Sequence, residues 1–300
     1  MVFKDKKKLF GYFCAIFGAT AWGFSGICGQ FLMSSGGLSS KELATIRLIF
    51  GGIILLLVSF VTSKEKTLRI LKNKKDLITC AIFGIFGVLF SQFTYLTTIF
   101  YTNAPTATVL QFLSSILIVI GICIRELRFP KVKEVCAIFL AILGTFTLAT
   151  HFNLNNLVIN PLGLTWGIIS AVSVVIYTLL PIEIIKKYGS TVATGYGMLI
   201  GGIVFSVYTK PWTFNLNLNA MTLGGIIIMV VVGTVLAYNM FLHGVSIIGP
   251  VRGSVIAGIE AVSAIVFSVL LLREKVELID LFGMALIMLA ITVLSLNQKN

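Results

Sequence analysis

The sequence predicts an all-α integral membrane protein with ten transmembrane helices, arranged as two inverted five-helix repeats around a central cavity. Three observations support this fold class. Hydrophobic residues make up 57% of the 300 positions and charged residues only 11%, which leaves more apolar surface than a soluble domain can bury. The apolar residues occur in segments of about 20, long enough to cross a hydrocarbon core of about 30 Å as helices. Landmarks of the first half of the chain recur in the second half.

The ten predicted spans follow one another with short polar connections. Each is much longer than a barrel strand, which would have about ten residues of alternating polarity. The basic stretch 4–8 precedes an apolar run that is too long for a signal peptide and lacks a small-x-small cleavage site, so we expect an anchor helix. The join between the third and fourth spans depends only on the turn residues Asn103–Pro105. The spans are 9–33, 41–62, 77–101, 104–124, 133–152, 162–185, 192–210, 220–244, 250–272 and 277–297.

The basic residues test the number of spans and predict the orientation. The chain carries 23 Lys and Arg residues against 11 Asp and Glu, but these lie between the apolar segments and do not indicate a nucleic-acid partner. With the N-terminus in the cytoplasm, all but five of the basic residues fall in cytoplasmic loops and termini, as the positive-inside rule requires. We therefore expect a multi-pass protein of the cell (plasma or inner) membrane with cytoplasmic N- and C-termini. The five exceptions are Lys41, Arg47, Lys210, Arg273 and Lys275.

An internal repeat supports the division into two halves. Three landmarks recur in the same order at offsets of 144, 145 and 148 positions. Because each half holds five helices, an odd number, the halves must insert with opposite orientations, and inverted repeats place a binding site at their interface near mid-membrane. We expect residues 1–152 to form the first repeat and 153–300 the second. The recurring landmarks are Trp22-Gly23 with Trp166-Gly167, Pro105 with Pro250, and Arg125-Glu126 with Arg273-Glu274.

These landmarks also carry a resemblance to a known family. The Trp-Gly pairs, the segment "TIRLIFGG" (45–52) and the closing "IRE" and "LRE" resemble the EamA-type ten-helix drug/metabolite transporter superfamily over nearly the whole chain. Within it, "ATVLQFLSS" (107–115), "GTFTLATH" (144–151) and "KYGSTVATGYGMLIGG" (187–202) are similar to the YicL-like branch. The resemblance implies secondary transport of small metabolites, mainly amino acids and often outward, with the fifth and tenth helices peripheral. Many relatives have proline where this chain has Ser115 and Ala261, so no proline hinge is expected there.

Polar residues inside the spans predict where a solute would bind. A polar side chain near mid-membrane is costly and persists where it faces a cavity or a partner. The fifth and tenth spans are nearly pure hydrocarbon, whereas the sixth carries four polar or aromatic residues at spacings of four, three and four, on one helical face. Hydrogen bonds between helices are the competing explanation. The predicted substrate-binding residues are Trp22, Gln92, Tyr95, Gln111, Trp166, Tyr177, Tyr238, Asn239 and Glu260.

Two charged residues within the spans have several interpretations. Burial disfavours the charged form of a carboxylic acid, so Glu260 is the candidate for proton coupling. It could instead pair with an ammonium group of the solute, or be a structural, hydrogen-bonded acid. Arg47 is expected to snorkel to the surface or to pair with Glu42, with attraction of an anionic group as the alternative. The aromatic residues suit a flat or cationic solute, although packing between helices explains them as well.

The sequence excludes several classes of function. There is no phosphate-binding loop of an ATP-driven pump, and the two histidines and five scattered cysteines offer no metal or catalytic cluster, so we expect no enzyme, no cofactor and no metal. We predict a secondary active transporter of small polar organic metabolites, amino acids or related compounds, exporting them by alternating access. Import of a nutrient or vitamin, such as a flavin or an amine, is the alternative; a channel or a membrane sensor is less favoured. Expected partners are the metabolite and the lipid bilayer, with a homodimer as a further option.

Overall fold

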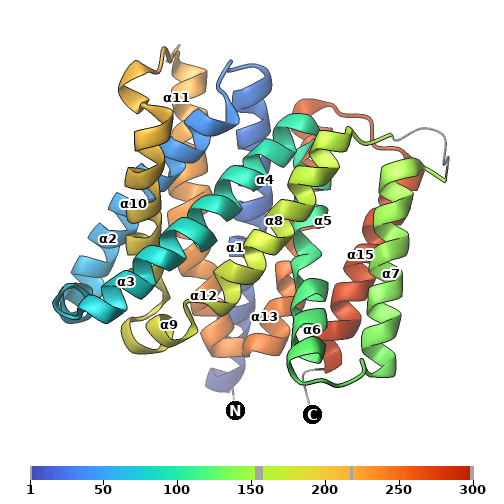
Figure 1. Cartoon of the computed structure of the whole chain (residues 1–300), viewed down its shortest axis with the longest axis horizontal. Coiled ribbons are helices and arrows are strands. Elements are labelled where there is room, and N and C mark those ends of the chain that lie inside the picture. Colours follow the sequence, from blue (N-terminus) through green and yellow to red (C-terminus); the bar gives the residue numbers. More distant parts are fainter. Residues whose placement is uncertain (1, 153–157, 217–218, 298–300) are drawn as a thin grey trace.

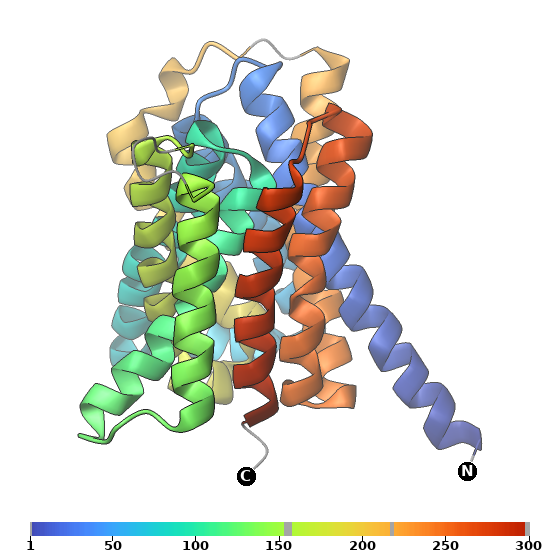
Figure 2. The same ribbon diagram turned by 90° about the vertical axis from the view of Figure 1, so that its right-hand side faces the viewer.

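The computed structural model of the chain describes residues 2–152, 158–216 and 219–297, and all regular elements in these ranges are helical. Nine helices in the described ranges are long and apolar enough to cross a membrane, and the tenth predicted span is a shorter apolar helix, Leu278–Leu294. The helices run along one another in a single bundle (Figures 1 and 2). The prediction of an all-helical membrane protein is confirmed.

Several spans consist of consecutive elements because π-helical turns or breaks interrupt them. In the first half these are α1 (Val2–Ser34), α2 (Ser40–Lys72), α3 (Lys74–Ile82) with η1 (Phe83–Leu89) and α4 (Phe90–Tyr101), α5 (Ala104–Phe112) with α6 (Ser114–Arg125), and α7 (Val132–Thr150). In the second half they are α8 (Pro161–Leu179), the short α9 (Ile182–Tyr188), α10 (Ser190–Thr209), η2 (Pro211–Thr213), α11 (Ala220–Ile227) with η3 (Ile228–Leu236) and α12 (Ala237–Ile248), α13 (Pro250–Ala257) with α14 (Ile259–Phe267) and η4 (Ser268–Leu272), and α15 (Leu278–Asn297).

Helix ends follow the capping residues in the sequence. Ser39 and Glu42 form a capping box at the start of α2, in which the Ser39 hydroxyl accepts from the Glu42 amide and the Glu42 carboxylate accepts from the Ser39 amide. The Asn103 side chain accepts from the Thr106 amide at 2.8 Å and starts α5 directly after α4. The predicted join at Asn103–Pro105 is therefore confirmed.

Both ends of the described chain lie at one end of the bundle. The first turns of α1 and the last turns of α15 both lie at this end, apart from each other (Figure 2), and we call it the terminal end and the opposite one the distal end. At the terminal end Asp76 accepts hydrogen bonds from Lys187 and from Tyr188, which joins α3 to α9. The hydrogen bond to Asp76 raises the pKa of the Lys187 ammonium above its usual range. That the terminal end is cytoplasmic stays a prediction.

The helices of the two halves pack in matching pairs. The second and seventh spans, α2 and α10, pack on each other, as do the fifth and tenth, α7 and α15. α1 packs on α12 as α8 packs on α4, and α1 packs on the ninth span (α13 and α14) as α8 packs on the fourth (α5 and α6). A twofold axis in the membrane plane produces this exchange of partners. α7 and α15 lie together at one side of the bundle (Figures 1 and 2). The proposed boundary between repeats 1–152 and 153–300 borders residues 153–157, which lie outside the described ranges, and stays a prediction.

The irregular turns of the spans also recur in both halves. The π-helical segments η1 and η3 begin 145 positions apart, and the helix interruptions at Leu113 and Gly258 have the same spacing. The fourth and ninth spans therefore break even though they carry Ser115 and Ala261 in place of proline. π-helical turns inside α-helices are frequent at functional sites, and both the π-helical segments and the helix interruptions lie at mid-span.

The third and seventh spans touch backbone to backbone at glycines. A Cβ added to Gly84 would lie 2.6 Å from the Gly197 carbonyl oxygen, and one added to Gly201 would lie 2.6 Å from the Gly84 carbonyl oxygen. Small residues allow membrane helices to approach in this way, which gains dispersion contacts along the crossing. Because backbone atoms cannot move aside as a flexible side chain can, this crossing holds η1 in a fixed position against α10.

We expect Gly201→Ala to lower the free energy of unfolding by about 1–3 kcal/mol, the usual cost of overpacking. Gly224→Ala is the matched control, because a Cβ added to this helical glycine meets no atom within 4 Å. Thermal unfolding of the purified protein in detergent measures both. Equal midpoints for the two variants would contradict the tight crossing.

Candidate functional site

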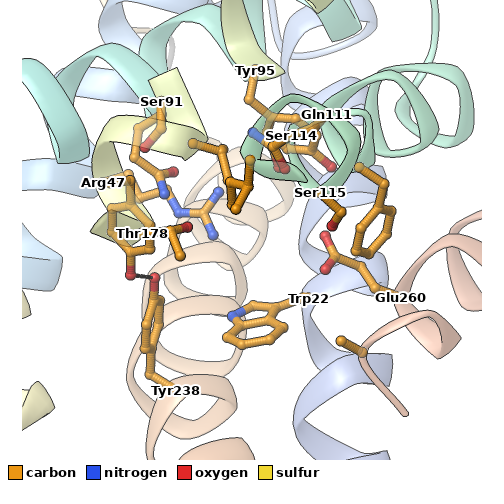
Figure 3. A pocket seen from close by; sticks show the side chains of 16 residues that line it. Trp22, Arg47, Ser91, Tyr95, Gln111, Ser114, Ser115, Thr178, Tyr238 and Glu260 are labelled. Atoms are coloured by element: carbon orange, nitrogen blue, oxygen red, sulfur yellow. Dashed lines mark hydrogen bonds between the residues drawn. The ribbon is translucent and has the colours of Figure 1, made fainter. Parts of the chain in front are cut away.

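A cavity of about 380 Å³ lies inside the bundle at the level of the helix breaks. Seven spans contribute to its wall, and most of the side chains that line it are polar or aromatic (Figure 3). The lining residues are Trp22, Arg47, Ser91, Gln92, Tyr95, Gln111, Phe112, Ser114, Ser115, Ile118, Val174, Tyr177, Thr178, Tyr238, Ala257 and Glu260.

Distal to the cavity, α1 packs directly on α4 and α5. The Tyr95 hydroxyl forms a hydrogen bond of 2.9 Å with Thr108, and a Cβ added to Gly26 would lie 2.7 Å from that hydroxyl. One turn further, Gln30 accepts from the Ala104 amide at 2.7 Å and donates to Glu274. Ile118, Thr178 and Ala257 line the cavity from the parts of their spans that lead to the terminal end. The cavity therefore extends toward the terminal end.

Among the described residues that line this cavity, Arg47 alone carries a full positive charge. Its side chain is buried, at 5% exposure; Nε donates to Thr234 Oγ1 at 3.1 Å and Nη2 donates to the Gly233 carbonyl at 3.2 Å. No described carboxylate lies within 4.0 Å of it, and the guanidinium points into the cavity (Figure 3). The prediction that Arg47 snorkels or pairs with Glu42 is wrong, because Glu42 is held in the capping box and the side chain of Arg47 turns inward to η3.

Glu260 faces the same cavity from the first turn of α14. Its carboxylate lies beside the Ser115 side chain and is directed toward the cavity (Figure 3). Ser115 and Glu260 are 145 positions apart, the spacing of the two helix breaks. Ser114 and Ser115 occupy the corresponding place after the break of the first half, so of the two halves the second carries the acid there.

The glycines of the two recurring Trp-Gly pairs pack in the same way, but the two tryptophans differ in whether they line the cavity. A Cβ added to Gly23 would lie 2.5 Å from the Glu260 carbonyl oxygen, and one added to Gly167 would lie 2.6 Å from the Leu110 side chain. Each glycine thus brings its helix against the broken span of the other half. Trp22 lines the cavity, whereas Trp166 packs edge-on against Phe93, with ring centroids 5.7 Å apart.

Aromatic side chains join α8 to α12 along one wall of the cavity. The hydroxyls of Tyr177 and Tyr238 form a hydrogen bond with each other (Figure 3). Trp22 packs edge-on against Tyr238 with ring centroids 5.2 Å apart. This wall offers π faces and hydroxyl groups to a bound molecule.

The structure brings together seven of the nine predicted substrate-binding residues. Trp166 and Asn239 do not line the cavity: Asn239 donates to the Val235 carbonyl and accepts from Thr191 on α10. A role in substrate binding stays a prediction for all nine. The residues that line the cavity around it are Trp22, Gln92, Tyr95, Gln111, Tyr177, Tyr238 and Glu260.

Several polar lining residues were not among the predicted set. Arg47 was noticed in the sequence but assigned to the surface. Ser114 and Ser115 follow Gln111 by three and four positions, so the helical stripe of Gln111 could have indicated them. Nothing in the sequence distinguishes Ser91 or Thr178 from hydroxyl residues that bond to the backbone of their own helix.

The EamA-like transporter family matches residues 9–150 and again 161–296. This chain belongs to the EamA-like transporter family. The family resemblance predicted from the sequence is therefore confirmed, and the protein is a membrane transporter.

Relatives of this EamA-family transporter cover almost the full chain. A Salmonella typhimurium protein named "Uncharacterized inner membrane transporter YicL" is 36% identical over 290 residues, 96% of each chain. An "Uncharacterized transporter" of Clostridium kluyveri is 24% identical over 96% of this chain and 94% of its own. A crystal structure with 15% identity matches at a TM-score of 0.64 over 98% of this chain and 99% of that one, which shows the same fold.

We expect Thr234→Val to destabilise the transporter by about 1.5–3 kcal/mol, because a buried hydrogen bond to a charged group is lost. Thr234→Ser keeps the hydroxyl that accepts from Arg47 Nε and is the control. Thermal unfolding of the three proteins in one detergent gives the comparison. If the valine and serine variants unfolded at the same temperature, the hydrogen bond between Arg47 and Thr234 would not be what holds the guanidinium in place.

Proposed function

We propose that this EamA-family protein is a secondary active carrier that exports small zwitterionic metabolites, amino acids or related compounds, by alternating access. The observation that carries the proposal is Arg47: a buried guanidinium, bonded only to neutral groups, faces a cavity inside the membrane. Charged side chains in such positions are costly and mark the paths of substrates or ions.

The chemistry of the cavity suits a solute with two opposite charges. Arg47 presents free donors to a carboxylate, which a guanidinium can bind through two parallel hydrogen bonds. Glu260 lines the same cavity and can accept from an ammonium group. The two side chains do not form an ion pair within 4.0 Å, so a solute can lie between them. Ser91, Gln92 and Ser115 supply neutral polar groups around it.

The size of the cavity supports a small solute. A volume of about 380 Å³ is near the lower end of the range of about 300–1,000 Å³ for small-molecule pockets. The aromatic wall of Trp22, Tyr177 and Tyr238 would pack against the part of the solute that varies between compounds.

The arrangement of the helices supports alternating access. Both halves carry a break and a π-helical segment at matching positions, next to the cavity, and inverted repeats can exchange their conformations around a fixed site. The cavity extends toward the terminal end, which the positive-inside rule predicts to be cytoplasmic. A carrier loaded from that side and emptied at the distal end would export its solute.

The proposed coupling ion is the proton, carried by Glu260. In the low-dielectric interior, a protonated Glu260 leaves Arg47 free for an anionic group, whereas the ionised form favours an ammonium group. Proton binding at one membrane face and release at the other would then link the proton gradient to solute movement. No other described Asp or Glu lines the cavity.

The test of solute class uses two variants with opposite expectations. Arg47→Gln should weaken binding of an amino acid about 10- to 150-fold, which corresponds to a loss of about 1.5–3 kcal/mol, and should leave binding of a matched amine without a carboxylate unaffected. Glu260→Gln should weaken binding of the same amino acid and should not weaken binding of a matched acid without an amine, because the amide no longer repels a carboxylate. Thermal stabilisation of the purified protein by single amino acids first identifies the solute, and saturable counterflow in proteoliposomes then measures transport.

Arg69→Gln and Glu183→Gln are the matched controls, since both residues are exposed and lie outside the cavity. If both cavity variants lost binding of the amino acid, the amine and the acid to the same extent, this result would contradict recognition of a zwitterion. Flux without counterflow would indicate a channel, and net movement only toward the terminal end would favour import of a nutrient.

The proton role predicts a separate result in proteoliposomes. An imposed pH gradient should drive accumulation of the solute by the wild-type protein, while Glu260→Gln should retain solute exchange without accumulation, because amide and carboxylic acid have a similar shape and only the acid releases a proton. Transport and its pH dependence that are both unchanged in Glu260→Gln would show the proton role to be wrong.

A further inference from the structure

A second hollow lies on the outside of the bundle between the third and seventh spans. It has a volume of about 250 Å³ and an almost entirely apolar wall. Phe90, Val204 and Tyr208 in this wall are 44%, 43% and 66% exposed, so the hollow opens to the hydrocarbon of the bilayer. Its main lining residues are Leu89, Phe90, Phe93, Val204, Phe205 and Tyr208.

The glycine crossing of the two spans creates this groove. Backbones of η1 and α10 touch at Gly84 and Gly197. Two to three turns further toward the distal end, whole aromatic rings separate the helices, and the Phe93 and Phe205 centroids lie 5.2 Å apart. Spans that meet at a point and then diverge leave a wedge between them. The groove runs along η1 and α4 from residue 85 to residue 93, a length of about 12 Å at about 1.5 Å per residue.

Two lysines lie at the distal mouth of the groove. Lys41 Nζ donates to the Tyr208 hydroxyl at 3.1 Å and lies 5.0 Å from the centroid of the same ring. Lys210 follows Tyr208 by two positions and is exposed. Neither ammonium has a carboxylate partner within 4.0 Å in the described ranges. Trp212 follows Lys210 by two positions and is 74% exposed, as is typical of aromatic residues at the membrane interface.

We propose that the groove binds one anionic phospholipid from the leaflet at the distal end. An acyl chain lies along the aromatic wedge, and the phosphate of the head group lies between Lys41 and Lys210. Paired cations next to an apolar groove between membrane helices are the features that recognise anionic lipids. A second copy of the chain fits less well, because a twofold contact through this face would bring like-charged lysines together.

Native mass spectrometry of the detergent-purified protein, titrated with phosphatidylglycerol or phosphatidylcholine, tests the proposal. We expect one phosphatidylglycerol to bind in preference to phosphatidylcholine. Lys41→Gln should weaken phosphatidylglycerol about fivefold, the equivalent of about 1 kcal/mol per basic residue, and leave phosphatidylcholine unchanged. Lys275→Gln removes an exposed charge near the distal end, outside the groove, and should change neither.

A second variant tests the apolar part of the site. Val204→Trp fills the wedge from its lipid-facing side and should reduce binding of both lipids, with the fold checked by thermal unfolding. Equal affinity for the two lipids, or no effect of Lys41→Gln, would overturn the proposal. So would a dimer that Val204→Trp converts to a monomer, since a second copy would then occupy the groove.

Discussion

One guanidinium held inside the membrane is the constraint on which the centre of this transporter depends. Arg47 reaches from α2 to the π-helical segment η3, where a hydroxyl and a backbone carbonyl accept its hydrogens. Removing a full charge from water costs several kcal/mol unless polar groups replace the solvent. The packing of α1, α2 and η3 supports this charge because it brings those polar groups to the guanidinium. The cavity lies on the side of the guanidinium that these groups do not cover.

Irregular helix turns supply that support, and those beside the cavity occur in pairs. Each half contributes a π-helical segment and a broken helix, at matching positions and beside the cavity. Regular helices would use every backbone carbonyl for internal hydrogen bonds, whereas a widened turn leaves some carbonyls available to side chains. The glycines next to these turns, such as Gly23 against Glu260, keep neighbouring spans close. Close packing and irregular backbone thus coexist within a few residues.

The sequence predicts the spans, their joins and the family well, because those depend on hydropathy and on local capping residues such as Asn103. It predicts the cavity less completely. The depth of Arg47 depends on how η3 widens beside it, and a π-helical turn has no clear sequence signal. Trp166 shares a helical face with Tyr177, yet a helical face is wider than a cavity of this size, and the indole packs against Phe93 instead. The chemistry of Glu260 was visible because an acid inside an apolar run is costly wherever it points.

The unequal positions of Trp22 and Trp166 carry a consequence for kinetics. If the halves of the carrier proposed above exchange conformations, Trp166 would turn toward the solute as Trp22 leaves it, so the solute would meet one indole in either orientation. The surroundings of the two indoles differ, since Trp22 packs on Tyr238 and Trp166 packs on Phe93. By detailed balance, any resulting difference in solute affinity between the two orientations would equal the difference between the orientation equilibria of the empty and the loaded carrier.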